Sequence, residues 1–380
     1  MSEQCQNCGG CVFRTLEKQA YRQKKENDFK QTIGQIKNAS PLIDAPVFID
    51  DGLRRRADMA FSYQKGKLII GFNEALSHNL VDIKDCPMLT PELNALLPKL
   101  RHFLEEFCSI RLNVKNKKKK LETITIKSGS VHLLNADNGI DIVLTLSAEP
   151  GLEHRLLTAD FINANPEICR ISWGKEGEVP EKIAETQPPE LYIAGFAIEI
   201  PQRAFLQASK AAEQAMIKTV LSYMSPTTGK IADLFCGLGT FTYPLAQNKA
   251  NEIISADSSK TSLQGLKKAL DRNQIHNVKI IERNLFKYPF DADDFKNIKA
   301  IVMDPPRAGA HEQCRTLSEL APSAKPEKIV FISCNPKTFV YDAQVLINAG
   351  YVFERVTLID QFVYSKHQEL IALFTYNPKK

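Results

Sequence analysis

A cysteine lies where an apolar strand is expected to end. Residues 327–333, EKIVFIS, form a short apolar run, and Cys334 follows in the sequence Ser333-Cys334-Asn335-Pro336. A strand that ends at such a turn places its last side chains at the rim of a sheet, and in open α/β sheets that rim binds ligands. A thiol there could act as a nucleophile, but free cysteines also commonly pack as small buried groups. Both interpretations of Cys334 stay open at this point.

A glycine turn follows another expected strand in the same half of the chain. Residues 233–240, DLFCGLGT, combine a strand end with two glycines, which let backbone amides approach a ligand closely. Asp257 ends the next strand, where a carboxylate can accept hydrogen bonds from ribose hydroxyls. The dinucleotide pattern G-x-G-x-x-G fails, because Thr242 occupies the third glycine position. The turn is therefore a candidate nucleotide site, with a plain tight turn as the alternative.

Two more expected strands end in polar side chains. Asn284 follows VKIIER, and Asp304 follows IKAIVM. In Asp304-Pro305-Pro306-Arg307 the prolines force an extended chain that presents Asp304 and Arg307 outward, unless the segment is only a solvated loop. In a parallel sheet all these strand ends converge on one crevice.

Three cysteines near the N-terminus repeat at a regular spacing. Cys5, Cys8 and Cys11 form C-x-x-C-x-x-C, and Cys86 precedes Pro87. Zinc sites usually consist of two separated C-x-x-C pairs, whereas three close cysteines with one remote ligand favour a [4Fe-4S] cluster. We expect a structural cluster held by these four thiols. Cys108, Cys169, Cys236 and Cys314 are assigned to packing.

The composition is that of an ordinary globular protein. The 380 residues are 43% hydrophobic and 24% charged, and the formal net charge of +5 is compatible with a polyanionic partner. The N-terminus has no apolar signal region, and no apolar run is long enough to span a bilayer. These features predict a cytoplasmic protein that does not bind membranes, and we expect a monomer.

The chain changes its pattern near residue 192. Residues 1–192 predict an α+β domain: a charged helix within 14–36, a hairpin in 46–72 around Lys65-Gly66-Lys67, a helix over 91–108, and strands with turns at Ser128-Gly129 and Asp137–Gly139. Residues 193–380 contain five short apolar strands separated by helix-length segments. That rhythm predicts a parallel, doubly wound α/β sheet of the Rossmann-like class.

The motifs together resemble a known enzyme family. DLFCGLGTFTYPLA, DPPRAGA, SCNPKTF and KHQELIALF, in this order, are similar to the RNA uracil-C5 methyltransferases, which use S-adenosylmethionine. The likeness extends to CQNCGGC and DCPML and so covers nearly the whole chain. It implies a class I methyltransferase domain over 193–380 and an iron–sulfur and RNA-binding domain over 1–192.

The resemblance also implies roles for single residues. Cys334 matches the cysteine that adds to C6 of uracil, and Glu369 matches the glutamate that removes the C5 proton before the cysteine is eliminated. Covalent addition is chemically reasonable, because C5 of an unactivated uracil is a poor nucleophile. The matching cofactor positions are Gln207, Phe235, Gly237, Thr240, Asp257, Asn284 and Asp304. Thr240 and Asp257 depart from the family's usual Asn and Glu.

The substrate is expected to be RNA. Asp304 and Arg307 could bind a flipped uracil, and Arg54 to Arg56, Lys115 and Lys117 to Lys120 could meet phosphates. Cluster-bearing family members without an N-terminal β-barrel domain are commonly ribosomal enzymes, so the resemblance favours 23S ribosomal RNA. Two alternatives are the same chemistry on the transfer-RNA T-loop and a non-catalytic iron–sulfur RNA-binding protein.

Overall fold

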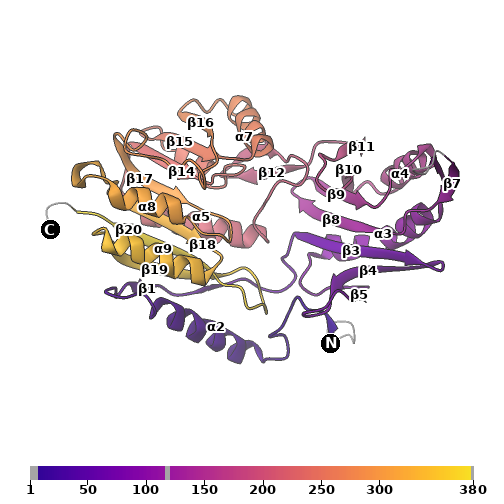
Figure 1. The fold of residues 1–380 in the computed structure, drawn as a ribbon, viewed down its shortest axis with the longest axis horizontal. Helices are drawn as coiled ribbons and strands as arrows, with labels where there is room; N and C mark the ends of the chain where they lie inside the picture. Colours follow the sequence, from indigo (N-terminus) through magenta and orange to yellow (C-terminus); the bar gives the residue numbers. More distant parts are fainter. Residues whose placement is uncertain (1–6, 116–119, 378–380) are drawn as a thin grey trace. The chain divides into compact units, whose positions relative to one another are not determined.

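A computed structural model describes residues 7–115 and 120–377, and its contacts divide the chain into two units (Figure 1). The first unit combines the segment ending at Val12 with Asp50–Leu191. The second combines Phe13–Ile49 with the chain from Tyr192 onward. The prediction that residues 13–49 belong to the N-terminal domain is therefore wrong. Two short strands in this segment, at Leu42–Ile43 and Val47–Phe48, pair with the strand Val352–Asp360 near the end of the chain. No local sequence pattern reveals a pairing over so long a distance in the chain.

The first unit is a seven-stranded sheet with two helices. The strands lie in the order β11-β10-β9-β8-β3-β4-β5, and every pair is antiparallel except β9 with β10. Helix α3 packs on β4 and β8, and α4 packs on β10 and β11. The bounds of these elements are β3 Arg56–Gln64, β4 Lys67–Asn73, β5 Leu80–Asp82, α3 Pro91–Ser109, β8 Ser128–Ala136, β9 Gly139–Leu146, α4 Leu152–Ala164, β10 Ile168–Gly174 and β11 Glu181–Glu185.

Most of the predicted elements of this unit are confirmed. The hairpin turns at Lys65 and Gly66, the helix begins at Pro91, and β8 turns into β9 at Asp137. The turn predicted at Ser128-Gly129 is wrong, because both residues lie in β8. Two short two-stranded ribbons lie outside the two large sheets: β6 Leu112–Lys115 with β7 Leu121–Ile124, and β12 Glu190–Ile193 with β13 Phe196–Glu199.

The second unit is built on a nine-stranded sheet. Its order is β1-β19-β20-β18-β17-β14-β15-β16, with β2 also paired to β19. The five predicted strands are confirmed as the parallel run β16, β15, β14, β17 and β18, and β20 joins them antiparallel. The strand bounds are β1 Leu42–Ile43, β2 Val47–Phe48, β14 Lys230–Leu234, β15 Glu252–Asp257, β16 Val278–Glu282, β17 Ile298–Met303, β18 Lys328–Ser333, β19 Val352–Asp360 and β20 Glu369–Thr375.

Helices cover this sheet and close its core. Helix α9 packs with α8 and α2, and α5 packs on β18, β19 and β20 (Figure 1). Phe29 and Ile33 of α2 join the apolar core formed by the strands. In the described part of the chain, no helix combines the length and apolar character that a membrane crossing requires. The bounds are α2 Lys18–Ile33, α5 Lys210–Met224, α6 Thr242–Ala246, α7 Lys260–Arg272, α8 His311–Glu319, the 3₁₀ turn η1 Pro322–Ala324 and α9 Pro336–Asn348.

Candidate active site

The strand order brings the predicted site residues to one edge of the sheet. Phe235, Asp257, Asp304 and Cys334 stand at or directly after the carboxyl ends of β14, β15, β17 and β18, which are neighbours in the sheet. Glu369 opens β20, and Ser333 pairs with Leu370 in the antiparallel ladder between β18 and β20. Because β20 begins where β18 ends, Glu369 reaches the edge that carries Cys334.

The glycine turn after β14 is shaped for a ligand. Phe235 and Gly237 have positive φ angles of 60° and 53°. The N–H of Gly237 donates to Oδ2 of Asp257 at 2.9 Å, which ties the turn to the end of β15. A Cβ at Gly237 would meet no atom within 4 Å, so space lies beside the turn. The residues present therefore fit a nucleoside whose ribose reaches Asp257.

Thr242, at the start of the helix that follows the glycine turn, is hydrogen-bonded to side chains of β14 and β15. Its hydroxyl donates to Oδ2 of Asp233 at 2.5 Å and lies 2.9 Å from the hydroxyl of Ser255. Thr242 and Asp233 are both fully buried. The residue that breaks the dinucleotide pattern thus fastens the start of α6 to β14 and β15. Thr240 lies half-buried in the same turn.

Asn284 lies after β16 in a tight turn of its own. Its side-chain oxygen accepts hydrogen bonds from the N–H groups of Phe286 and Lys287 at 3.1 and 3.3 Å. The ring of Phe286 lies 5.5 Å from the ring of Phe235 in the glycine turn. The turn after β16 therefore contributes an aromatic wall beside the glycine turn.

A chain of buried amides joins the two carboxylates at the sheet edge. Glu369 is 3% exposed, and its Oε2 accepts a hydrogen bond from Nε2 of Gln361 at 2.8 Å. The same Nε2 donates to Oε1 of Gln207 at 2.9 Å, and Nε2 of Gln207 donates to Oδ2 of Asp304 at 3.3 Å. Gln207, expected at the cofactor, is thus linked to the expected base.

Both carboxylates hold protons more tightly than usual. Burial, with the charge of Asp304, raises the pKa of Glu369 to about 8, although the Gln361 hydrogen bond and Arg307 act in the opposite direction. Burial raises the pKa of Asp304 to about 7, against the hydrogen bond from Gln207. Two carboxylates with such pKa values can accept or release protons near neutral pH.

The Cys334 thiol is half-buried and protonated at neutral pH. Burial, together with the charges of Glu369 and Asp304, raises its pKa to about 11, while the guanidinium of Arg307 acts in the opposite direction. Attack by this sulfur must therefore be coupled to loss of its proton. Cys236, in the glycine turn, is buried as predicted, and so are Cys108, Cys169 and Cys314.

Arg307 is exposed to solvent in the proline loop that follows β17. Its carbonyl oxygen accepts hydrogen bonds from the Asn335 side chain at 2.8 Å and from the Thr338 hydroxyl at 3.4 Å, which join the proline loop to the start of α9. Its Nη2 lies 3.3 Å from Nε2 of His367. His367 thus contacts Arg307, and the side-chain hydrogen bond to Glu369 comes from Gln361.

Helix α2 fastens the loop that joins β19 to β20. Lys25 is 1% exposed; its ammonium lies 2.9 Å from the Asp360 carboxylate and also donates to the carbonyl of His367. The Tyr21 hydroxyl donates to Asp360 at 2.5 Å and accepts from the N–H of Tyr364 at 2.8 Å. Side chains of α2 therefore hold the loop between β19 and β20 at both of its ends.

The described cysteines of the N-terminal cluster lie in the first unit. Cys8, Cys11 and Cys86 are half-buried, and Cys5 lies outside the described residues. The side chain of Asn94 accepts from the N–H of Cys86 and donates to its carbonyl, both at 2.9 Å. Within the described ranges, no three His, Cys, Asp or Glu side chains form a group that could hold a metal ion.

The predicted RNA-contacting residues divide into exposed and buried groups. Arg54 is exposed, Arg55 is 4% exposed, and Arg56 begins β3. Lys117 to Lys119 lie outside the described residues, while Lys120 is exposed. Arg54 and Lys120 are therefore the accessible described cations from the two predicted basic runs.

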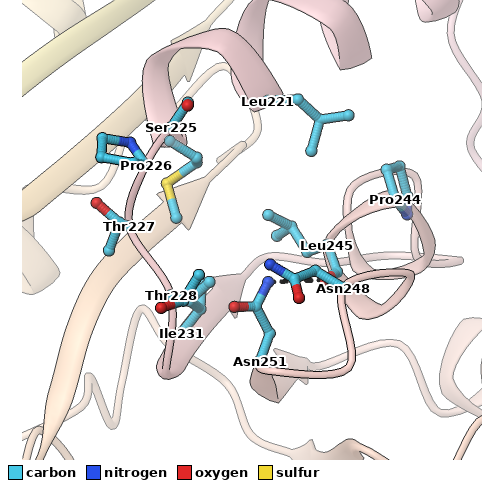
Figure 2. Close-up of a pocket in the computed structure, with 11 residues that line it drawn as sticks. Leu221, Ser225, Pro226, Thr227, Thr228, Ile231, Pro244, Leu245, Asn248 and Asn251 are labelled. Atoms are coloured by element: carbon cyan, nitrogen blue, oxygen red, sulfur yellow. Dashed lines mark hydrogen bonds between the residues drawn. The ribbon is translucent and has the colours of Figure 1, made fainter.

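A pocket lies in the second unit, near the amino ends of β14 and β15 and so away from the strand ends that carry the predicted site. Figure 2 shows it between the end of α5 and the segments that precede β14 and β15. Its volume is about 190 Å³. The side chain of Asn251 accepts from the N–H of Gly229 and donates to the carbonyl of Leu245, so its polar atoms are already used. This pocket contains none of the predicted site residues.

Gln361 is the site residue that was missing from the sequence-based prediction. It directly follows β19, so the rule that polar side chains at strand ends gather at a ligand site applies to it as well. β19 was not among the predicted strands, because the rhythm of strands and helices does not reveal that it lies beyond β20, the strand that joins the parallel run antiparallel.

Comparison with known proteins places residues 190–376 in a recognised family. They match the family described as tRNA (Uracil-5-)-methyltransferase. A Mesorhizobium japonicum protein named as an uncharacterized RNA methyltransferase is 32% identical over 371 residues, which cover 96% of this chain and 82% of that protein. The 23S rRNA (uracil(1939)-C(5))-methyltransferase RlmD of Haemophilus influenzae is 29% identical over 377 residues, covering 97% and 80%.

The fold is also similar to a solved structure. The Pyrococcus abyssi tRNA (uracil-54, C5)-methyltransferase, determined in complex with S-adenosyl-L-homocysteine, aligns with a TM-score of 0.72 and 21% identity. The alignment covers 97% of this chain and 86% of that one. At this identity the likeness shows the fold, which is the α/β class I methyltransferase fold.

Proposed function

The chain belongs to the RNA (uracil-5-)methyltransferase family, and we propose that it methylates C5 of a specific uridine in 23S ribosomal RNA. It is an S-adenosylmethionine-dependent enzyme, and this membership favours catalysis over the non-catalytic RNA-binding alternative. The choice of 23S RNA is supported by the similarity to the Haemophilus influenzae enzyme. The observation that carries the chemistry is the placement of Cys334 and Glu369 at one end of the β18–β20 ladder.

In the proposed reaction the sulfur of Cys334 forms a bond to C6 of the uracil as it loses its proton. The electron pair of the C5–C6 double bond then forms a bond from C5 to the methyl group of the donor, whose bond to the sulfonium sulfur breaks so that a neutral thioether leaves. Glu369 next removes the C5 proton, the C5–H electron pair re-forms the double bond, and the C6–S bond breaks. The raised pKa of Glu369, about 8, suits a base that takes up this proton and later releases it.

Residues of the glycine turn would hold the methyl donor. S-adenosylmethionine supplies a methyl group on a positively charged sulfonium. Asp257 would accept from the ribose, Gly237 leaves room beside the turn, and Phe235 with Phe286 would enclose the adenine. Gln207, Asn284, Asp304 and Thr240 complete the proposed cofactor set. Asp304 and Arg307 would also face the flipped base.

Trapping with 5-fluorouracil RNA tests the chemistry. The fluorine at C5 cannot leave as a proton, so the enzyme should remain bonded to methylated RNA through Cys334. We expect a covalent adduct with wild-type protein and S-adenosylmethionine and none with Cys334→Ala, while Cys314→Ala, which changes a buried cysteine on α8, should form the adduct. Adduct formation by Cys334→Ala would contradict the proposed nucleophile.

The same residues could instead modify the T-loop of transfer RNA. The name of the matching family and the Pyrococcus abyssi structure both concern transfer RNA. Deleting the gene and mapping 5-methyluridine by nucleoside digestion and mass spectrometry separates the two substrates. Loss from 23S RNA alone supports the proposal, whereas loss from transfer RNA alone would replace the substrate and keep the chemistry.

We also propose that Cys5, Cys8, Cys11 and Cys86 hold a structural [4Fe-4S] cluster. Cysteine thiolates are the usual ligands of such clusters, and two of these residues, Cys8 and Cys86, pack against the core of the first unit. Gly9 allows the loop to pass β4, because a Cβ there would lie 2.7 Å from the Ala75 nitrogen. Iron and sulfide analysis of anaerobically purified protein should find the cluster in wild type and Cys108→Ser but not in Cys86→Ser.

A further inference from the structure

Gln361 is a buried glutamine with every polar atom of its side chain in use. It is 6% exposed, its Oε1 accepts from the N–H of Ala208 at 3.1 Å, and its Nε2 donates to Glu369 and Gln207. An N–H group can only donate, so the Ala208 amide identifies which atom of Gln361 is the oxygen. The donor end of the amide is thereby directed at the Glu369 carboxylate.

We propose that Gln361 is the positioning residue of the general base, holding the Glu369 carboxylate toward C5 of the uracil and linking it through Gln207 to the cofactor site. The proposal rests on the proposed function, since it assigns Glu369 to the removal of the C5 proton. Gln361 itself touches neither the base nor the methyl donor in this scheme. It acts through the side chains of Glu369 and Gln207.

The surroundings of Glu369 explain why such a donor is needed. The charged groups that act on it are Asp304 and Arg307 after β17, and Glu369 in turn acts on the titratable thiol of Cys334 after β18. Helix α5, packed on β20, contributes the Met216 sulfur 4.0 Å from Nε2 of Gln361 and buries the carboxylate of Glu213. On β19, Asp360 is paired with Lys25. Gln361 is the hydrogen-bond donor that the structure shows at Glu369.

Only the last step of the reaction uses the base. Glu369 takes the C5 proton, the electron pair of the C5–H bond forms the C5–C6 double bond, and the sulfur of Cys334 leaves with the electrons of the C6–S bond. Loss of Gln361 removes a hydrogen bond that lowers the pKa of Glu369, so less of the carboxylate is ionised at neutral pH. The addition and methyl-transfer steps do not require this ionisation.

The experiment compares Gln361→Met with the wild-type enzyme. The substrate is total RNA from a strain lacking the gene, with radiolabelled S-adenosylmethionine, at a series of pH values. We expect methylated RNA covalently bound to the variant to increase about tenfold at neutral pH, and the midpoint of product release to move up by about one pH unit. The adduct with 5-fluorouracil RNA should form as in wild type, because it needs no base.

Two further variants separate positioning from a general loss of structure. Gln313→Met makes the same change at a fully buried glutamine on α8, which bonds the backbone of Phe290, and should lower stability without accumulating the adduct. Gln361→Asn keeps a buried amide but is one methylene too short to span its partners. It should therefore accumulate the adduct like Gln361→Met.

The outcomes distinguish this proposal from the proposed function. If wild type traps 5-fluorouracil RNA while both Gln361 variants release product at the wild-type midpoint without accumulating adduct, the positioning role is wrong. The same holds if the variants lose both trapping and S-adenosylmethionine binding, which would indicate a structural role. If the wild type itself traps nothing, the proposed chemistry fails first.

Discussion

Burial of Glu369 in the folded protein disfavours the ionised form of its carboxyl group. A glutamate ordinarily ionises near pH 4.5, whereas burial raises the pKa of Glu369 to about 8. The folded protein therefore binds this proton more tightly than the unfolded chain does between those pH values. Stability from this group is fully present below the unfolded pKa and is lost as the pH rises through the folded pKa. The site thus holds a destabilising carboxylate where the reaction needs a base.

Glu369→Gln should consequently stabilise the protein while abolishing product release. At pH 7.5 we expect the free energy of unfolding to rise by up to about 4 kcal/mol, because the wild-type carboxyl group ionises when the chain unfolds and the amide cannot. The difference between variant and wild type should shrink toward pH 4.5. Denaturant unfolding across this pH range measures it. A variant less stable than wild type at pH 7.5 would show that ionised Glu369 contributes favourable contacts that exceed its burial cost.

Gly237→Ala should weaken cofactor binding with little loss of stability. The residue has φ near 53° and open space at the Cβ position, so the backbone cost is about 1 kcal/mol and the new methyl group intrudes on the proposed ligand space. Gly66→Ala is the matched control, since Gly66 also has positive φ and no atom near its Cβ. Calorimetric titration with S-adenosylmethionine should show reduced affinity for Gly237→Ala alone.

At the scale of residues, the sequence predicts site residues that lie at the ends of strands. It does not predict a residue whose role depends on hydrogen bonds to other site residues. Asp257, Asp304 and Cys334 follow apolar runs, and the sheet brings them together as expected. Gln361 was missed because its proposed role depends on side-chain hydrogen bonds to Gln207 and Glu369 that form only in the folded chain. A hydrogen bond between residues 154 positions apart leaves no local pattern.

At the scale of elements, α2 supports the active site through one loop. Lys25→Met should leave the Asp360 carboxylate buried without its ammonium partner, which typically costs about 3–5 kcal/mol. Thermal or denaturant unfolding measures the loss. Lys24→Met on the same helix is the control: its ion pair with Asp28 is 3.0 Å long but half-exposed, so its loss should cost less than about 1 kcal/mol. Equal losses for the two variants would contradict the bracing role of α2.

The elements themselves were predictable where the pattern is strong, and one error is instructive. The five parallel strands and α3 follow from apolar rhythm, and α2 follows from its charged, helix-prone sequence. Gly129 was taken for a turn, but it lies in β8, where a Cβ would stand 2.2 Å from the Thr145 carbonyl and 2.7 Å from the Phe61 ring. Glycine is needed there for close packing, and the sequence alone does not distinguish the two uses.

At the scale of the whole molecule, the second unit is made of two separate segments. The segment Phe13–Ile49 supplies α2, β1 and β2, and the rest begins at Tyr192. Residues 192–380 expressed alone should therefore lack a cooperative unfolding transition, because Asp360 loses Lys25 and β19 loses two paired strands. A synthetic peptide of residues 13–49 should restore the transition, as followed by circular dichroism. A cooperative fragment without peptide would contradict this division.

The monomeric state and the cytoplasmic location stay predictions at this scale. The iron–sulfur cluster does too, since its first ligand, Cys5, lies outside the described residues.

The pairing of α2 with the last strands also bears on how the protein matures during translation. Tyr21 leaves the ribosome early, but its partner Asp360 lies 339 residues later. At ordinary synthesis rates the helix waits roughly 20 to 70 seconds for that partner. During this interval Phe29 and Ile33 have no core to enter, so the nascent chain exposes these two apolar side chains, which chaperones could bind. Completion of the loop bearing Gln361 thus becomes one of the final events of folding.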